Sequence, residues 1–469
     1  MSTSVTTQVY DLPASEIPRE KSNINVVNPQ FDLPAPPHVV VRARSTTEGI
    51  EMNVLGRSRN DEGAFPGDDN SSFNESGESS RKEWAAVTAC SLCLFLSGWH
   101  DGSIGLLIPT IQNYYNLTFT VVSVLFVSGC LGFMLSAILN VHLSDHLGFG
   151  RVMFLGGICQ VISNAMLVPA FPFPVMVIAF VVNGFGIGLQ DALANGFVSA
   201  LRNNPSAKMG IIHSLYGAGA FVAPFIATQF ANQPHWSYLY MIPLVISTLN
   251  LAFSFSTFRF HTQEELLGPI QPADPVESAS NERKYRQVFG SWTVHVMALF
   301  CLLYVGAETT IGGWIVTFLV EERGGGTSAG YISSGYFGGL MLGRIGLIWL
   351  NEKVGERRVV YGYVLLAIGL EMTVWMLPHL LGNAIALTLV GVLMGMNVLR
   401  TTIPKWLLTG SMGWVASVGQ AGAALFPFLT GILIQKYGVG VLQPILVALL
   451  GGMTIPWALV PSDTKRRGD

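Results

Sequence analysis

Acidic side chains stand inside several long apolar stretches of this chain. Asp101 lies within residues 84–111, Asp191 within 175–201 and Glu308 within 288–320. A carboxylate in a hydrocarbon layer is costly, so it usually marks a functional site rather than packing. A carboxyl in a low-dielectric cavity can bind and release a proton near neutral pH. The residues therefore favour proton binding inside a membrane, and a polar contact with backbone freed by nearby glycines is the simpler alternative for Asp101.

Further polar and aromatic residues accompany these acids. Asp191 and Asn195 are four residues apart and share one helix face, with Gln190 as a neighbouring hydrogen-bonding group. Glu308 precedes Trp314, and an indole suits the apolar face of a sugar ring whose hydroxyls a carboxylate can bind. These patterns predict substrate-binding residues, and the alternatives are a polar clamp between helices at Asp191 and a structural kink at Glu308. We add as cavity candidates, each of which also suits packing, Trp99, Asn183 and Gln420.

Two more charged residues fall inside apolar stretches, Glu371 and Arg344. We interpret them as members of salt bridges in the membrane or at its edge. Arg344 could also serve a gating loop nearby.

The composition excludes a large soluble enzyme. Hydrophobic residues make up 50% of the chain and charged residues 12%, against about 25% charged in an ordinary soluble domain. The net charge of −3 argues against a nucleic-acid partner. No nucleotide loop, metal cluster or catalytic triad order is recognisable, so we expect no enzyme, no metal and no cofactor.

Twelve apolar stretches match the about 20 residues that a helix needs to cross a bilayer. We therefore predict an all-α membrane protein with twelve transmembrane helices in two six-helix halves. The stretches are residues 84–111, 118–143, 151–170, 175–201, 209–231, 236–258, 288–320, 329–350, 359–376, 383–403, 408–434 and 438–460.

The polar segments divide the chain into regions. We expect a disordered tail over residues 1–83, bundles over 84–260 and 288–460, a linker over 261–287 and a short tail over 461–469. Lys and Arg gather in the connectors after the even-numbered stretches, whereas the others are nearly bare except for Arg323 and Lys436. By the positive-inside rule both termini are then cytosolic.

An internal repeat supports two equivalent halves. Residues 145–152 follow the second stretch and residues 352–359 follow the eighth. Each copy places an acid, a glycine and an arginine in the same order, and we assign these residues to gating: Asp145, Gly148, Arg151, Glu352, Gly355 and Arg357. A duplicated transporter carries its site at the interface of the halves.

Both loops resemble the signature loop of the major facilitator superfamily, although Val141 and Ile348 replace its leading glycine. Residues 186–195, 213–220 and 304–314 are similar to the fucose–galactose–glucose/proton symporter branch of that superfamily. The resemblance implies alternating access, a cytosolic charge network in the loops, and proton coupling at Asp101 and Asp191. Residues 396–402 depart from the branch, which usually has a Gly-Pro-rich segment there.

The expected function is therefore proton-coupled uptake of a sugar or a similar small polar solute. The alternative is a proton antiporter that exports a small organic metabolite or drug, and a non-transporting sensor is a further alternative. The expected partners are the lipid bilayer, the solute and the proton, with the protein monomeric. The expected location is the plasma membrane, with a vacuolar or other internal membrane as the alternative.

Overall fold

The structure is a computed structural model that describes residues 69–267, 290–396 and 405–460. Within these ranges the chain is almost entirely helical and contains no strand. Most of the expected N-terminal tail and linker, the C-terminal tail and the segment 397–402 with Arg400 lie outside the described residues.

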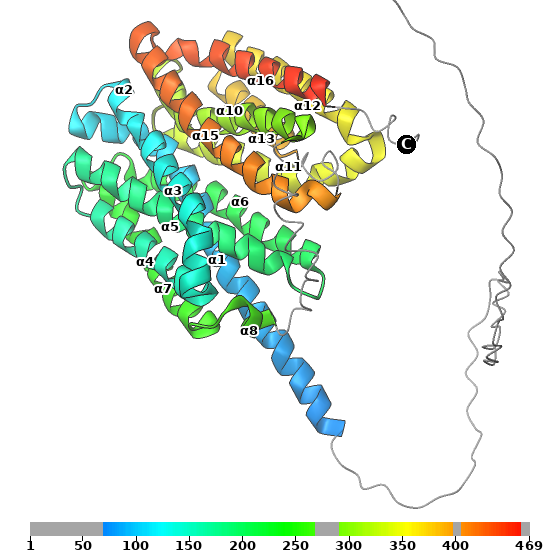
Figure 1. The fold of residues 1–469 in the computed structure, drawn as a ribbon. Coiled ribbons are helices and arrows are strands. Elements are labelled where there is room, and N and C mark those ends of the chain that lie inside the picture. The colour runs from blue at the N-terminus through cyan, green and yellow to red at the C-terminus, as the bar shows by residue number, and fades with distance from the viewer. Residues whose placement is uncertain (1–68, 268–289, 397–404, 461–469) are drawn as a thin grey trace, which may run out of the picture. The chain divides into compact units, whose positions relative to one another are not determined.

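The first half of the chain forms one helical bundle (Figure 1). Its long helices pack as α1 with α6, α3 with α5, and α4 with α5 and α7. The elements are α1 (Asp69–Tyr115), α2 (Phe119–Val122), α3 (Val124–Leu147), α4 (Phe149–Leu167), α5 (Phe173–Ser199), α6 (Pro205–Phe230), η1 (Trp236–Tyr240), α7 (Met241–Phe258) and α8 (Gln263–Leu267).

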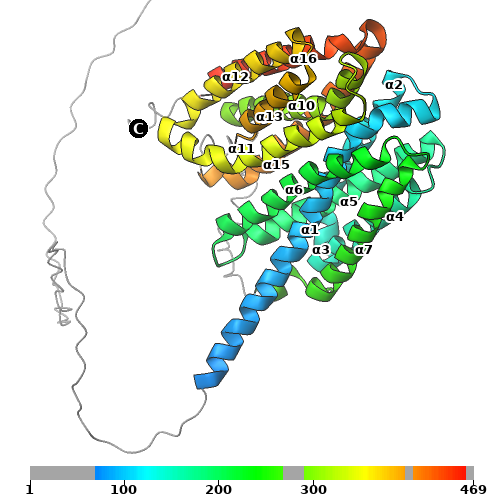
Figure 2. The ribbon, with the colours of Figure 1, turned by 180° about the vertical axis from the view of Figure 1, so that it is seen from behind.

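The second half forms another bundle, coloured yellow-green to red, which Figure 2 shows from behind. Helix α10 packs with α15 and α16, α11 with α13, and α12 with α13 and α16. The elements are α10 (Trp292–Glu321), η2 (Gly326–Ser328), α11 (Ala329–Val354), α12 (Glu356–Met376), α13 (Leu380–Met394), α15 (Lys405–Tyr437), η3 (Val439–Val441) and α16 (Leu442–Leu459).

The predicted class, an all-α membrane protein, is confirmed. Ten helices of the described chain are long and apolar enough to cross a membrane. Helix α13 is apolar but has only 15 residues, and α11 occupies the place of the eighth expected span. The exact number of twelve spans therefore stays a prediction.

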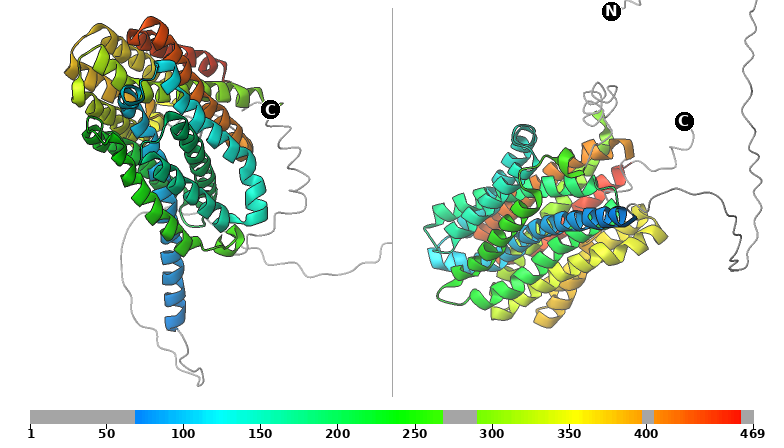
Figure 3. Two further views of the ribbon diagram at one scale, coloured as in Figure 1. Left: turned by 90° about the vertical axis from the view of Figure 1, so that its left-hand side faces the viewer. Right: turned by 90° about the horizontal axis from the view of Figure 1, so that it is seen from below.

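Helix α1 begins at Asp69, well before the boundary at residue 84 that the apolar pattern suggested. Its N-terminal part runs past the other helices of its bundle (Figure 3). Residues 69–83 are thus helical, whereas the sequence placed them in the disordered tail. The reason is that polar residues such as Lys82 are compatible with a helix, so the apolar pattern alone does not mark where the helix begins.

The two repeated loops share one backbone geometry. Gly148 and Gly355 have φ angles of 81° and 91°, which L side chains rarely adopt. Gly148 N–H donates to the carbonyl oxygen of Ser144, and Gly355 N–H to that of Asn351, both at 3.0 Å. Each glycine ends one helix and begins the next, so the same sharp turn occurs at equivalent places in the two halves. We call the end of the bundles that carries these turns the glycine-loop end.

The two halves touch at the opposite end, which carries α2 and which we call the α2 end. There the Phe119 N–H donates to Gln435 Oε1 at 2.8 Å, and Gln229 Nε2 donates to the Tyr331 hydroxyl. At the glycine-loop end, in contrast, Val141 of α3 is 66% exposed and Ile348 of α11 is 47% exposed. The interface between the halves is therefore closed at the α2 end.

Candidate functional site

A cavity lies between the two halves, near the middle of the long helices. Helices α1, α3, α5 and α6 line it from one half, and α10, α11 and α15 from the other. Its polar lining includes Ser97, His100, Asp101, Tyr216, Glu308, Thr309 and Gln420, and its aromatic lining is Phe126, Phe133 and Phe337.

Asp101 of α1 faces this cavity. The Tyr216 hydroxyl of α6 donates to Asp101 Oδ2 at 2.7 Å. Close packing of α1 on α6 sets this geometry, because a Cβ added to Gly98 would lie 1.9 Å from the Tyr216 carbonyl oxygen. The sequence found Asp101 directly, whereas Tyr216 appeared in it only as part of a family-like segment.

Glu308 of α10 enters the cavity from the other half and forms an ion pair there. An Arg344 guanidinium nitrogen lies 3.1 Å from Glu308 Oε1. The two side chains are 11% and 25% exposed, so the pair is largely withdrawn from solvent. The expected pairing of Arg344 within a salt bridge is therefore seen, with Glu308 as its partner beside the cavity.

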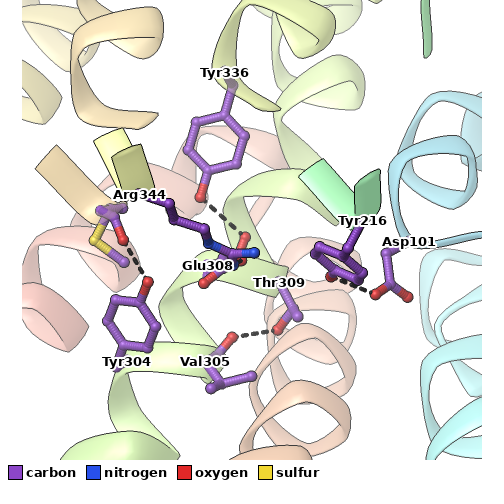
Figure 4. Close-up of polar contacts among 9 residues, drawn as sticks. Asp101, Tyr216, Tyr304, Val305, Glu308, Thr309, Tyr336 and Arg344 are labelled. Atoms are coloured by element: carbon purple, nitrogen blue, oxygen red, sulfur yellow. Dashed lines mark hydrogen bonds and ion pairs between the residues drawn. The ribbon is translucent and has the colours of Figure 1, made fainter. Parts of the chain in front are cut away.

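The ion pair reaches the other half through Tyr216. The guanidinium carbon of Arg344 lies 5.3 Å from the centre of the Tyr216 ring. Asp101, Tyr216, Arg344 and Glu308 thus form a continuous polar path from α1 to α10, which we call the cross-cavity path (Figure 4). Cation–π contact and charge-assisted hydrogen bonding make each step electrostatically sensitive to the next.

His100 is a second cavity residue that the sequence did not single out as a site. Its Nδ1 lies 2.9 Å from Asn183 Nδ2, and its ring lies 5.1 Å from that of Phe180. Because an amide nitrogen only donates, this contact makes Nδ1 the acceptor and leaves the ring proton on Nε2. His100 is then a neutral hydrogen-bond donor, and Asn183 positions it from behind.

Asp191 lies behind the cavity wall rather than in it. Ser97, which lines the cavity, donates from its hydroxyl to Asp191 Oδ2 at 3.1 Å. Asp191 Oδ1 is buried without a partner in the described chain. Asn195 Nδ2 donates to the backbone oxygen of Asp191 at 2.8 Å. The two residues share a helix face, as predicted, but the amide bonds the backbone of Asp191 and not its carboxylate.

Besides Asn195, three more predicted substrate-binding residues lie outside the cavity lining. Gln190 accepts from Gln160 at 3.0 Å and donates to the Met153 carbonyl at 3.1 Å, so it joins α5 to α4. Trp314 is 0% exposed, and its indole N–H donates to the Pro427 carbonyl. Trp99 is 3% exposed and packs beside Phe95. In this structure these three residues hold helices together. The side-chain amide of Gln190 is already hydrogen-bonded, and the rings of Trp314 and Trp99 are buried.

The residues assigned to gating lie at the glycine-loop end. Asp145, Arg151 and Arg357 have exposed side chains, and none of the three forms an ion pair within the described chain. The guanidinium of Arg151 lies 5.8 Å from the Phe260 ring instead. The side chain of Glu352 is outside the described residues.

Glu371 corrects another expectation, since it is not part of a salt bridge. It is 0% exposed in α12, and neither carboxylate oxygen has a hydrogen-bond partner in the described chain. Arg344, the other residue considered for such a bridge, pairs with Glu308. No group of three or more His, Cys, Asp or Glu side chains could hold a metal ion in the part of the chain that the structure describes.

Comparison with known proteins agrees with this architecture. Residues 90–405 match the model of the Major Facilitator Superfamily. Bypass of stop codon protein 6 of Saccharomyces cerevisiae is 26% identical over 412 residues, which cover 81% of this chain and 83% of that protein. A glucose/galactose transporter of Brucella abortus is 22% identical over 77% of this chain and 90% of its own length.

A third relative, the L-fucose-proton symporter of Escherichia coli, is 23% identical over 60% of this chain and 70% of its own length. Among solved structures, that of a D-xylose-proton symporter superposes with a TM-score of 0.66 and 12% identity, and covers 81% of this chain and 98% of that one. The structural likeness concerns the fold alone.

Proposed function

The chain belongs to the Major Facilitator Superfamily, and we propose that it is a proton-coupled secondary transporter of a sugar or a similar small polar solute. The observation that carries the proposal is the cavity at the interface of the halves, where Asp101 and Glu308 face each other's bundle. Relatives that are a glucose/galactose transporter and an L-fucose-proton symporter support the substrate class.

The lining of the cavity suits a hydroxylated solute. His100, Thr309 and Gln420 offer neutral hydrogen-bonding groups, and Glu308 offers charge-assisted acceptors. Phe126 and Phe337 supply apolar surface for the carbon face of a ring. A few convergent polar groups among aromatic walls are typical of small-molecule sites, so the solute would bind between the two halves.

The charges in the cavity favour proton coupling. The cross-cavity path holds two carboxyls, Asp101 and Glu308, and one guanidinium, Arg344. Arg344 forms an ion pair with Glu308, whereas Asp101 forms no ion pair with any of the described residues. A proton on Asp101 removes the remaining negative charge and weakens the bond from Tyr216, because a neutral carboxyl accepts a hydrogen bond less strongly.

This change can pass to the other half of the protein. The ring of Tyr216 also makes a cation–π contact with the Arg344 guanidinium. A movement of the Tyr216 side chain therefore changes a contact that stabilises the Glu308–Arg344 pair. Protonation at α1 is thereby linked to substrate-binding groups on α10 and α11. We take this as the coupling between proton binding and the alternating access of the two halves. In this scheme the glycine-loop end faces the cytosol, as the distribution of Lys and Arg in the connectors suggests.

The proposal is tested with purified protein in proteoliposomes. A pH gradient is imposed, acidic on the side of the α2 end, and accumulation of radiolabelled hexoses, pentoses and polyols is measured. We expect one or more of these solutes to accumulate, and accumulation to stop when a protonophore collapses the gradient. Uptake that ignores the gradient would contradict proton coupling.

The direction of flux separates the proposal from the antiport alternative. Three phenylalanines in the lining would also accept a small aromatic metabolite or drug. If the solute crosses the membrane only in the direction opposite to that of the protons, the protein is an antiporter that exports the solute. Movement of solute and protons in the same direction supports the symporter.

A further inference from the structure

A buried carboxyl in the C-terminal half has no role in the cavity. Glu371 of α12 is 0% exposed and does not line the cavity, and both its oxygens lack partners in the described chain. Burying a charged carboxylate without a partner is strongly unfavourable, because nothing replaces the water that would solvate the charge. A group with this cost must be neutralised, and no side chain of the described residues does so.

Other buried polar side chains lie at the level of Glu371. The indole N–H of Trp457 donates to the Arg357 carbonyl at 3.1 Å, which fixes the register of α16 against α12. Residue 371 follows 357 by fourteen positions, and residue 443 precedes 457 by the same number. Because the two helices run antiparallel with equal rise, Glu371 and Gln443 lie at one depth. Gln443 is 0% exposed, and its amide also lacks partners there.

Helix α13 contributes a further unsatisfied amide. The α12–α13 connector joins Met376 to Leu380, so Glu371 stands five residues before the turn and Asn383 three residues after the helix start. These offsets differ by about 3 Å along the helix axis. Asn383 is 0% exposed, and neither its Nδ2 nor its Oδ1 has a hydrogen-bond partner in the described chain.

The charged and titratable groups around Glu371 are few. From the segment after α10, Arg323 donates to the carbonyls of Val374 and Trp375 at 3.0 and 2.8 Å, nearer the end of α12. From α11, the Tyr336 hydroxyl donates to the Glu308 carbonyl at 3.3 Å. From α13 and α16 come the neutral amides. Neither the guanidinium nor the phenol bonds the carboxyl within the described residues.

We propose that Glu371 is a second proton-binding site, separate from Asp101 and loaded from the α2 end of the C-terminal bundle. A proton needs no ligand shell, which fits a carboxyl whose oxygens approach no other polar group. The path is short, because Glu371 is five residues from the end of α12, about 7.5 Å along the axis. Asn383 and Gln443 lie at about the same depth along their helices as Glu371. Asp101, in contrast, is reached through the cavity between the halves.

The site is tested by infrared spectroscopy of the whole protein in lipid nanodiscs. A buried protonated carboxyl has a carbonyl-stretch band that an ionised carboxylate lacks. We expect this band near neutral pH in the wild type, its loss in Glu371→Gln, and its persistence in Asp101→Asn. Glu321→Gln, which removes an exposed acid at the end of α10, is the matched control and should keep the band.

Isotope labelling separates glutamate from aspartate. Glutamate labelled with ¹³C at its side-chain carboxyl shifts the band of any protonated glutamate, Glu371 included, and leaves those of Asp101 and Asp191 in place. A band that shows no isotope shift, or one that survives in a folded Glu371→Gln protein, overturns the proposal. If the band of protonated Glu371 appears only when Na⁺ is replaced by choline, Na⁺ competes with the proton for the carboxylate. That result would also overturn the proposal of a site that binds only a proton.

The direction of loading is tested in proteoliposomes with a pH jump on one side of the membrane. A cysteine introduced at Pro378, in the α12–α13 connector, reports by impermeant labelling which side the α2 end faces. The band of Glu371 should respond first to a pH change on that side. A faster response from the other side would refute loading from the α2 end. These outcomes do not depend on solute transport, so they are distinguishable from failure of the proposed function.

Discussion

At the scale of single residues, pairing decides what each acid within the long helices can do. Glu308 is neutralised by Arg344, Asp101 accepts only from a phenol, Asp191 accepts from Ser97 with one oxygen, and Glu371 accepts from nothing in the described chain. An acid with a fixed cationic partner keeps its charge and can hold a substrate hydroxyl. An acid without one is free to exchange a proton, which is why we assign coupling to Asp101 and not to Glu308.

Asp101→Asn should abolish accumulation of solute against its gradient. The amide has the size of the protonated acid but cannot release a proton. Exchange of solute across the membrane without a gradient should survive, because it requires no net proton movement. Counterflow and accumulation measured on the same proteoliposomes check this, with Glu321→Gln as the control. Accumulation by both Asp101→Asn and Asp191→Asn would exclude these two acids as coupling sites.

Tyr216→Phe should uncouple proton binding from solute binding while preserving the fold. The ring that supports Arg344 remains, and only the bond to Asp101 is lost. A hydrogen bond to a charged group contributes about 1.5–3 kcal/mol, so the pH dependence of solute affinity should weaken by about tenfold or more. Binding titrations at several pH values measure this. Tyr240→Phe, away from the cavity, should behave as the wild type.

The Glu308–Arg344 pair should be more sensitive to single than to double substitution. Removing one partner leaves the other charge buried, which typically costs about 3–5 kcal/mol. Glu308→Gln and Arg344→Gln should therefore each lower the thermal unfolding temperature, and the double variant should recover part of the loss. All three should bind solute less tightly. Equal unfolding temperatures in the wild type, both single variants and the double variant would show that the pair is solvated and does not stabilise the fold.

At the scale of helices, small residues set how closely the elements approach. A Cβ added to Gly105 of α1 would lie 1.9 Å from the carbonyl oxygen of Gly312 in α10. This contact brings the first helices of the two halves together beside the cavity. Close backbone approach through glycine is a common device in membrane bundles, where lipid provides no hydrophobic drive for helix association.

Gly105→Ala should therefore separate α1 from α10 and reduce transport. The added methyl collides with backbone, which cannot move aside as a flexible side chain could. We expect a several-fold loss of transport rate and a lower unfolding temperature. Gly346→Ala in α11 is the control, since a Cβ there meets nothing within 4 Å. Normal transport by Gly105→Ala would mean that this approach is not needed in the transport cycle.

At the scale of the whole molecule, the proposed alternating access requires the two halves to part at the α2 end. Gln229 of α6 and Tyr331 of α11 meet across that interface, as do Phe119 and Gln435. The structure thus presents one state of the cycle, with the α2 end closed. Opening there must break these contacts while the glycine-loop end comes together.

Joining Gln229→Cys to Tyr331→Cys by a disulfide should arrest transport. The bond would hold the α2 end closed, and a reducing agent should restore activity. The matched pair is Val141→Cys with Ile348→Cys at the glycine-loop end, which should not form a bond in this state. Gel mobility and uptake before and after reduction check both pairs. Full transport by the oxidised Gln229–Tyr331 pair would rule out separation at this place.

The sequence by itself determined the membrane class, the helical architecture and the family resemblance. Long apolar stretches have few alternatives to helices, since backbone polar groups must be satisfied inside lipid. The acids Asp101 and Glu308 were recognisable for the same reason, because a charge in an apolar stretch stands out without any knowledge of its neighbours. The equivalent turns at Gly148 and Gly355 followed from a repeated local motif.

Only the tertiary structure decided which residues meet. Tyr216 and Arg344 lie far from Asp101 and Glu308 in sequence, and helix packing alone brings them into one cross-cavity path. The same packing directs Gln190 and Trp314 into helix interfaces, although their types suited a solute. Periodicity along a helix tells which residues share a face, but not which neighbour that face meets. The contacts between helices settle that, and with it the difference between a residue that lines the cavity and one that holds the wall together.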